Sequence, residues 1–196
     1  HQEAYNTLAD LDETVLDNSF FNAKLIQNDV EYCQEIWEEW VNLEKTDIID
    51  GAETFFKYVE SKGVEIYYVS NRLLSSYEAT ISNLKQFNLP YLDMEHILLK
   101  TTSSGKEPRR QKIMEKHNII LLLGDNLSDF SMVFDNQNTV RRNLLVDSLM
   151  SEFGQRFIVF PNPMYGDWET KGVYEGKYDW TATQKDSLRK ANLMGY

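Results

Sequence analysis

Apolar residues follow two alternating patterns along this chain. Short runs rich in β-branched and aromatic residues occur at 64–71, 119–126 and 156–163, and each run ends in turn-forming residues. Such runs are typical of buried parallel strands. The segments with helical spacing of apolar residues predict helices at 51–63, 75–87, 139–154 and 181–195. This alternation of strand and helix predicts an α/β layered fold with a parallel sheet.

Two of the expected helices begin with a capping signal. Ser75 with Glu78, and Thr181 with Gln184, place a hydroxyl three residues ahead of a side chain that can reach back to the helix start. Both pairs therefore predict a capping box, in which each side chain accepts a hydrogen bond from the other residue's backbone N–H.

Composition bounds the class of protein. With 196 residues, 42% of them apolar, we expect a single domain over 1–196. The formal charge of −11 excludes a nucleic acid polymer as an expected partner, because no basic surface field is available for it. Cys33 is the single cysteine, which excludes an internal disulfide. No run of about 18 apolar residues occurs, so we expect no membrane span.

Polar side chains gather where the expected strands end, or just ahead of the next strand. The candidate site residues are Asp10, Asp12, Ser70, Asn71, Lys106, Asp125 and Asp129. Because ligands of a parallel sheet collect at the carboxyl ends of its strands, we expect these side chains to lie together. They supply a carboxylate nucleophile, carboxylates for Mg²⁺ and donors for phosphate oxygens. Phosphoryl transfer through an aspartyl-phosphate requires this set.

Each of these residues also has a structural interpretation when taken alone. Ser70 is a common turn residue, and Lys106 is typical of a solvated charge. Asp125 and Asp129 can be the cap and the first acidic residue of a helix. A calcium loop begun at Asp10 is excluded, since Val15 and Phe21 stand where such a loop requires Gly and Glu. The order of the residues at successive strand ends favours one shared site.

Four stretches, DLDETVLDNS, YYVSNR, SSGKEPRR and GDNLSDF, resemble the four motifs of the haloacid dehalogenase superfamily. With FIVFPNPMYGDWE added, the chain resembles more narrowly the class C "DDDD" acid phosphatases, which are secreted or lipid-anchored bacterial proteins. The resemblance runs over nearly the whole chain. It implies a Rossmann-like parallel sheet flanked by helices with a small helical cap. It also implies a Mg²⁺-dependent acid phosphatase that acts on small phosphomonoesters.

The resemblance assigns a role to each motif residue. It implies that Asp10 is the nucleophile that takes the phosphoryl group. It implies that Asp12 is the acid/base that protonates the leaving alkoxide and then activates water. On an extended segment, side chains two residues apart share one face, which fits joint action on one substrate. The implied Mg²⁺ ligands are Asp10, Asp12 through its carbonyl, Asp125 and Asp129, and the implied phosphate donors are Ser70, Asn71 and Lys106.

Residues 20–47 lie between the first two motifs, where this superfamily often inserts a cap. We expect a helical insertion there that forms part of the substrate pocket. Within it, Tyr32, Ile36, Trp40 and Leu43 follow helical spacing and are expected in the core.

Two aromatic residues are candidates for substrate binding. Trp37 matches the family position whose ring stacks on a nucleobase, and Tyr165 matches the facing aromatic position. Because flat rings stack on any base, the resemblance implies broad hydrolysis of nucleoside 5′-monophosphates. Ordinary packing is an equal alternative for Trp37, whereas the Asn, Pro and Gly residues around Tyr165 predict an exposed loop.

The residues ahead of Asp10 depart from the family pattern. Relatives place a long helix and then an apolar strand before the nucleophile, whereas QEAYNTLA (2–9) runs straight into Asp10. Since QEAYN resembles that helix, we expect the strand that carries the nucleophile to be missing from this sequence. The implied location is extracytoplasmic, secreted or at the cell surface, with any leader or lipid anchor upstream of His1. The resemblance leaves a homodimer open.

Two alternative functions stay open at the level of sequence. A surface protein could keep the scaffold and bind a nucleotide or anion without turnover, because a fold does not fix a function. A phosphotransferase of the same superfamily would differ only in what attacks the acyl-phosphate. Four aspartates that repel one another without a metal ion favour catalysis over silent binding.

Overall fold

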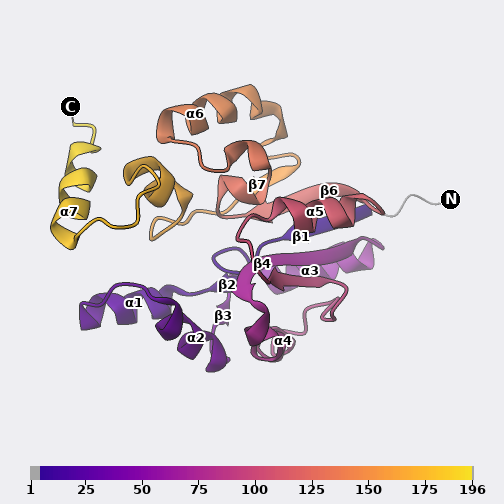
Figure 1. The fold of residues 1–196 in the computed structure, drawn as a ribbon. Coiled ribbons are helices and arrows are strands. Elements are labelled where there is room, and N and C mark those ends of the chain that lie inside the picture. The colour runs from indigo at the N-terminus through magenta and orange to yellow at the C-terminus, as the bar shows by residue number, and fades with distance from the viewer. Residues whose placement is uncertain (1–4, 196) are drawn as a thin grey trace.

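The computed structural model describes residues 5–195 and is built around a five-stranded parallel sheet (Figure 1). Its strands are β1 (Tyr5–Ala9), β4 (Glu65–Leu73), β5 (Ile97–Lys100), β6 (Asn118–Gly124) and β7 (Phe157–Val159). They are ordered β5-β4-β1-β6-β7 across the sheet. A small antiparallel pair is formed by β2 (Leu16–Asp17) and β3 (Asp47–Ile48). The three strands expected from the apolar runs are confirmed as β4, β6 and β7.

The α-helices are α1 (Ser19–Asn28), α2 (Gln34–Asn42), α3 (Ala52–Ser61), α4 (Tyr77–Lys85), α5 (Glu107–Met114), α6 (Thr139–Ser148) and α7 (Ala182–Ala191). The shorter turns are η1 (Leu74–Ser76), η2 (Leu127–Asp129), η3 (Met132–Phe134), η4 (Met150–Glu152) and the π-helical η5 (Trp168–Val173). The four expected helices are confirmed as α3, α4, α6 and α7. Within residues 5–195, no helix has both the length and the apolar character that crossing a membrane requires.

Helices cover both faces of the sheet. Alternate residues of a strand point to opposite faces, so Ile66 and Tyr68 of β4 pack in one core with Phe56 of α3. Val69 of the same strand packs in the other core with Ile113 of α5. Because both faces are buried, polar side chains from the sheet reach solvent most easily at the ends of its strands.

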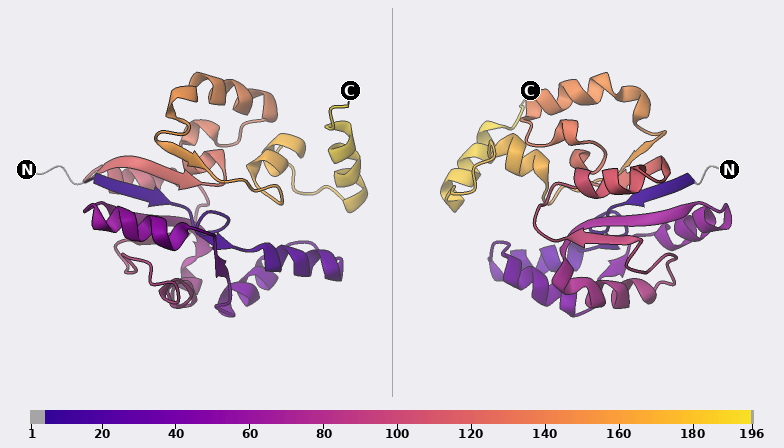
Figure 2. Two further views of the ribbon diagram at one scale, coloured as in Figure 1. Left: turned by 180° about the vertical axis from the view of Figure 1, so that it is seen from behind. Right: turned by 45° about the vertical axis from the view of Figure 1, so that its right-hand side comes forward.

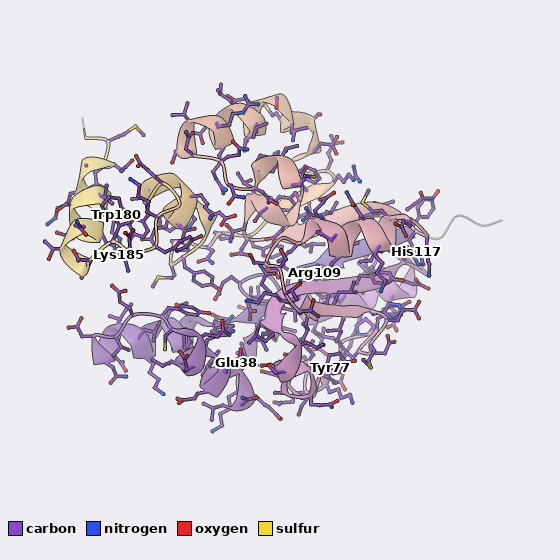
Figure 3. All side chains as sticks on the ribbon, in the orientation of Figure 1. Glu38, Tyr77, Arg109, His117, Trp180 and Lys185 are labelled. Atoms are coloured by element: carbon purple, nitrogen blue, oxygen red, sulfur yellow. The ribbon has the colours of Figure 1, made fainter. Side chains whose placement is uncertain are left out.

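The strand that carries Asp10 is present, and the expectation that it is missing is wrong. β1 lies at the centre of the sheet and pairs with β4 on one side and β6 on the other. The apolar pattern of the sequence does not indicate β1, because Asn6 and Thr7 are polar. Both are nevertheless buried, each at most 1% exposed. With its side-chain oxygen turned toward His117, the Asn6 amide accepts a hydrogen bond from His117 Nδ1 at 3.0 Å. Figure 3 labels His117. Tyr5 and Asn6 belong to β1, so QEAYN is not a helix there, and residues 2–4 lie outside the described residues.

Some local expectations fail for identifiable reasons. The capping box of Ser75 with Glu78 does not form, because Ser75 belongs to η1 and α4 begins only at Tyr77. Ser76 is the residue that precedes the helix, and its hydroxyl donates to Glu38 of α2 and does not cap α4. The box of Thr181 with Gln184 is confirmed at the start of α7.

The expected burial of the 20–47 segment is also only partly correct. Tyr32 and Leu43 are 58% and 51% exposed, so neither lies in the core, while Trp40 is half-buried. β5 and α5 were not expected at all, because the run at 97–100 is short and α5 is rich in charged residues.

Two segments extend beyond the carboxyl ends of the strands. Helices α1 and α2 form one segment, and the stretch from η5 to α7 forms the other. The views in Figures 1 and 2 both show this arrangement. An ion pair joins them, since Lys185 of α7 lies 2.7 Å from Glu31 in the loop between α1 and α2. Segments from the N-terminal and C-terminal parts of the chain are therefore joined beyond the end of the sheet.

Candidate active site

The candidate site lies where three neighbouring strands end. Asp10 directly follows β1, Ser70 lies in β4, and Asp125 directly follows β6. The Asp10 N–H donates to the Leu123 carbonyl at 2.9 Å, which extends the pairing of β1 with β6 up to the site. The parallel arrangement thus brings together residues that are far apart in the sequence.

Three carboxylates converge there. One oxygen each from Asp10, Asp125 and Asp129 lies within 4.8 Å of the other two. Asp129 reaches this position through the η2 turn, where its Oδ2 accepts from the Asn126 N–H at 2.9 Å. Carboxylate oxygens at this spacing are ligands that a hard divalent cation such as Mg²⁺ prefers. The residues present therefore fit the expected metal site.

Gly124 makes this approach possible. A Cβ built on Gly124 would lie 2.4 Å from the Cβ of Asp129, much closer than non-bonded carbon atoms approach. A side chain at position 124 would therefore push Asp129 away from the other carboxylates.

Lys106 is the cation that faces these carboxylates. Its Nζ lies 2.6 Å from Oδ1 of both Asp10 and Asp129, and the residue is 8% exposed. Burial lowers the pKa of Lys106, but attraction by the two carboxylates outweighs this and raises the pKa overall. Lys106 therefore stays charged at the site.

Burial and mutual repulsion disfavour the charged forms of Asp10 and Asp125. Burial raises the pKa of Asp10 well above its usual value, and repulsion by Asp129, Asp125 and Asp12 raises it further, against the opposing effect of Lys106. Burial and repulsion by Asp129 also raise the pKa of Asp125 to about 6. A single ammonium thus leaves charge that a divalent cation can offset.

Asp12 makes contacts different from those of Asp10. Oδ1 of Asp12 accepts from Arg72 Nη2 at 2.7 Å and from Asn18 Nδ2 at 3.0 Å. Arg72 Nε lies 3.1 Å from both oxygens of Asp12. Ser70 Oγ lies 3.5 Å from Asp12 Oδ2. The Asp12 carboxylate does not belong to the group formed by Asp10, Asp125 and Asp129. The metal contact implied for Asp12 therefore rests on its backbone carbonyl.

The expected phosphate donors lie on both sides of this centre. Ser70 is fully buried and its hydroxyl accepts from the Arg72 N–H at 3.1 Å. Asn71 is exposed, and its Oδ1 accepts from Arg109 Nη2 at 2.6 Å. Arg109, labelled in Figure 3, also donates to the Ser70 carbonyl and thereby ties the end of β4 to the start of α5.

The loop after β7 supports the metal ligands and carries Tyr165. Asn162 Nδ2 donates to Asp125 Oδ2 at 2.7 Å. Asn162 Oδ1 accepts from the Tyr165 N–H at 3.3 Å, so one side chain connects the two. The Tyr165 hydroxyl donates to Glu13 at 3.1 Å, and the residue is half-buried, although an exposed loop was expected. Burial raises the pKa of Glu13 to about 7, with a further contribution from Asp12.

Trp37 lies near Arg72, the arginine that contacts Asp12. Its half-buried ring is 5.0 Å from the ring of Phe21 in an edge-on contact, and the guanidinium carbon of Arg72 is 5.8 Å from its ring centroid. Trp37 and Tyr165 each approach Asp12 through one intervening residue, Arg72 and Glu13 respectively.

Sequence reasoning missed several residues of the site. Arg72 and Asn18 hold Asp12, and Asn162 holds Asp125, yet none has a motif spacing of its own. Arg72 and Asn162 stand inside the quoted stretches YYVSNR and FIVFPNPMYGDWE, and Asn18 stands inside DLDETVLDNS. A buried carboxylate needs polar partners, which is the one signal that could have pointed to them.

Known proteins share this architecture. A family model described as HAD superfamily, subfamily IIIB (Acid phosphatase) matches residues 1–168. Two solved structures of the class C acid phosphatase from Bacillus anthracis, one with tungstate bound, superpose with TM-scores of 0.95 and 0.94. Both are 41% identical to this chain and cover 100% of it, and the match covers 82% of their own chains. The expected α/β fold class is thereby confirmed.

Replacing Gly124 with alanine should disturb the carboxylate group directly. Because the new Cβ would clash with Asp129, we expect the free energy of unfolding to fall by about 1–3 kcal/mol. The rise in melting temperature on adding Mg²⁺ should also shrink. Thermal and chemical unfolding with and without Mg²⁺ measure both effects. Gly195→Ala is the control, since its Cβ would meet nothing within 4 Å, and equal behaviour of the two variants would contradict the steric explanation.

The metal-free protein should lose stability as pH rises from about 4 to about 7. Asp125 and Glu13 have folded-state pKa values raised from 3.8 to about 6 and from 4.5 to about 7. In this window the folded state binds more protons than the unfolded state. The stability contributed by these protons is fully present below the unfolded pKa values and is lost as pH rises through the folded pKa values. Melting temperatures measured in a chelator across this range provide the test. Glu13→Gln should reduce the slope, and a flat profile for the parent would oppose the assignment.

Proposed function

We propose a magnesium-dependent reaction through an aspartyl-phosphate, from the premise that this chain belongs to the acid phosphatases of HAD superfamily subfamily IIIB and is a phosphomonoesterase. The proposed substrates are nucleoside 5′-monophosphates. The observation that carries the proposal is the position of Asp10. Its carboxylate stands at the end of the central strand, 2.6 Å from the Lys106 ammonium and beside two further carboxylates.

A metal ion fits this arrangement by its chemistry. Asp10, Asp125, Asp129 and the Asp12 carbonyl would hold Mg²⁺, as the oxygen donors and their excess negative charge support. When bound, Mg²⁺ offsets the repulsion between the nucleophilic carboxylate and the negatively charged phosphate.

Asp10 performs the first chemical step. One of its carboxylate oxygens attacks phosphorus, the bond from phosphorus to the ester oxygen breaks, and the leaving alkoxide takes a proton from Asp12. Lys106 contacts Asp10 and so lies within reach of the phosphoryl oxygens as the new bond forms. The Ser70 hydroxyl lies near Asp12, where it can hold a further phosphate oxygen.

Asp12 completes the cycle in the second step. Its carboxylate, now without the proton, accepts a proton from water as the water oxygen attacks phosphorus. The bond from phosphorus to Asp10 then breaks, which releases inorganic phosphate and restores both aspartates. One carboxyl thus acts first as acid and then as base.

The substrate class rests on two aromatic residues that contact the neighbours of Asp12, Trp37 through Arg72 and Tyr165 through Glu13. Trp37 and Tyr165 come from α2 and from the loop after β7, so a ring system carried by the leaving group can reach both. Residues 20–47, with α1 and α2, would then supply one wall of the pocket. The Bacillus anthracis relative has a structure with tungstate, a tetrahedral oxyanion like phosphate, which supports an anion site of this kind here.

Asp10→Asn should abolish phosphate release, because an amide cannot serve as the nucleophile. We expect a loss of several orders of magnitude in kcat, measured as inorganic phosphate released from a nucleoside 5′-monophosphate with Mg²⁺ present. A chelator should remove the activity of the parent, and added Mg²⁺ should restore it. Asp179→Asn, an exposed aspartate, is the matched control and should behave as the parent does. Turnover by Asp10→Asn at the parent rate would show that another residue is the nucleophile.

Tyr165→Leu should affect nucleotides selectively. Loss of stacking on the base should raise KM for a nucleoside 5′-monophosphate about 10-fold and leave KM for glycerol phosphate unchanged. Tyr165→Phe, which keeps the ring and loses the hydrogen bond to Glu13, should retain the nucleotide KM. Tyr178→Leu is the control, since Tyr178 is 72% exposed. Equal effects of Tyr165→Leu on both substrates would argue against stacking.

A further inference from the structure

Asp10 and Asp12 stand two residues apart, yet each is paired with a different buried cation. Lys106 contacts Asp10, and Arg72 contacts Asp12. The Arg72 side chain is 0% exposed and that of Asp12 is 15% exposed. Two carboxylates this close along the chain also repel each other. Separate partners therefore keep the two side chains in separate places.

Arg72 holds Asp12 by its geometry as well as by its charge. Nε and Nη2 form a fork on the carboxylate, with distances of 3.1 Å from Nε to both oxygens and 2.7 Å from Nη2 to Oδ1. Nη1 points the other way and donates to Thr80 Oγ1 of α4 at 3.4 Å. A planar guanidinium fixed at both ends orients a carboxylate in a way that a single ammonium cannot.

Asn18 secures the same carboxylate from a second direction. Its amide donates to Asp12 Oδ1 at 3.0 Å, and its own Oδ1 accepts from Trp40 Nε1 at 2.8 Å. Asn18 is fully buried, so this amide has one defined orientation. Asp12 is thus held by Arg72 of β4, which α4 supports through Thr80. It is also held by Asn18, which α2 supports through Trp40.

We infer that Arg72 and Asn18 are positioning residues that keep the Asp12 carboxyl group aimed at the leaving oxygen and away from the three metal-binding carboxylates. This inference rests on the proposed function, in which Asp12 gives the leaving alkoxide its proton. Neither residue needs to touch the substrate. Their effect on the first step appears only where the leaving group needs the proton from Asp12, whereas the second step depends on Asp12 for every substrate.

The test compares leaving groups that differ in their need for a proton. p-Nitrophenolate departs without one, whereas the alkoxide of glycerol phosphate requires one. In Arg72→Lys, the charge stays but the fork is lost. We expect kcat/KM for glycerol phosphate, which reports the step that releases the leaving group, to fall roughly 100-fold, the size of effect that a displaced catalytic group produces. The first-turnover burst of p-nitrophenolate should stay within about threefold of the parent, because that step needs no proton from Asp12.

Three further variants separate the possible outcomes. Asp12→Asn should show the same dependence on leaving group, and Asp10→Asn should abolish the burst. If Asp12→Asn lacks that dependence, the acid role in the proposed function is wrong and the inference falls with it. If Asp12→Asn has it and Arg72→Lys lowers both rates equally, only the positioning role is overturned. Arg142→Lys, at a buried arginine of α6, is the matched control and should change neither rate.

Asn18→Ala keeps the inference testable if Arg72→Lys does not fold, as judged by circular dichroism and thermal unfolding. It removes one donor to Asp12 and leaves the ion pair with Arg72 in place. We expect the same selectivity for the leaving group at a smaller size, about 10-fold in kcat/KM for glycerol phosphate with little change in the p-nitrophenolate burst. Equal loss on both substrates, or no loss on either, would count against a positioning role.

Discussion

The buried ammonium of Lys106, held between Asp10 and Asp129, is the interaction on which the site depends. Carboxylates gathered at the end of a parallel sheet repel one another, and burial strengthens that repulsion because little water screens it. One cation offsets part of this charge and leaves the rest for a divalent ion. The same arrangement that opposes folding in the absence of metal would therefore provide affinity for a divalent ion.

The position of β1 explains why this is possible in a small chain. As the central strand, it delivers Asp10 between β4 and β6, whose ends supply Ser70 and Asp125. Helices then complete the site from the periphery, since Lys106 immediately precedes α5 and Asp129 ends η2. The sheet fixes the positions of Asp10, Ser70 and Asp125, while loops and helices place Lys106 and Asp129 around them.

Much of the fold could be predicted from the sequence, because long apolar runs such as β4 and β6 report burial directly. β1 could not, since Asn6 and Thr7 are buried polar residues and the partners of Asn6 become visible only in three dimensions. The same limit applies to the site. The motif aspartates could be placed by their order along the chain, whereas Arg72 shows its role only once the side chain is seen to turn toward Asp12.

The ion pair between Glu31 and Lys185 determines how firmly two segments of the molecule are joined. It joins the α1–α2 segment to α7, and the Glu31 side chain is 66% exposed. Exposed ion pairs contribute little free energy and weaken as dissolved ions screen them. The link between these two segments thus costs little to break, and it weakens further as ionic strength rises.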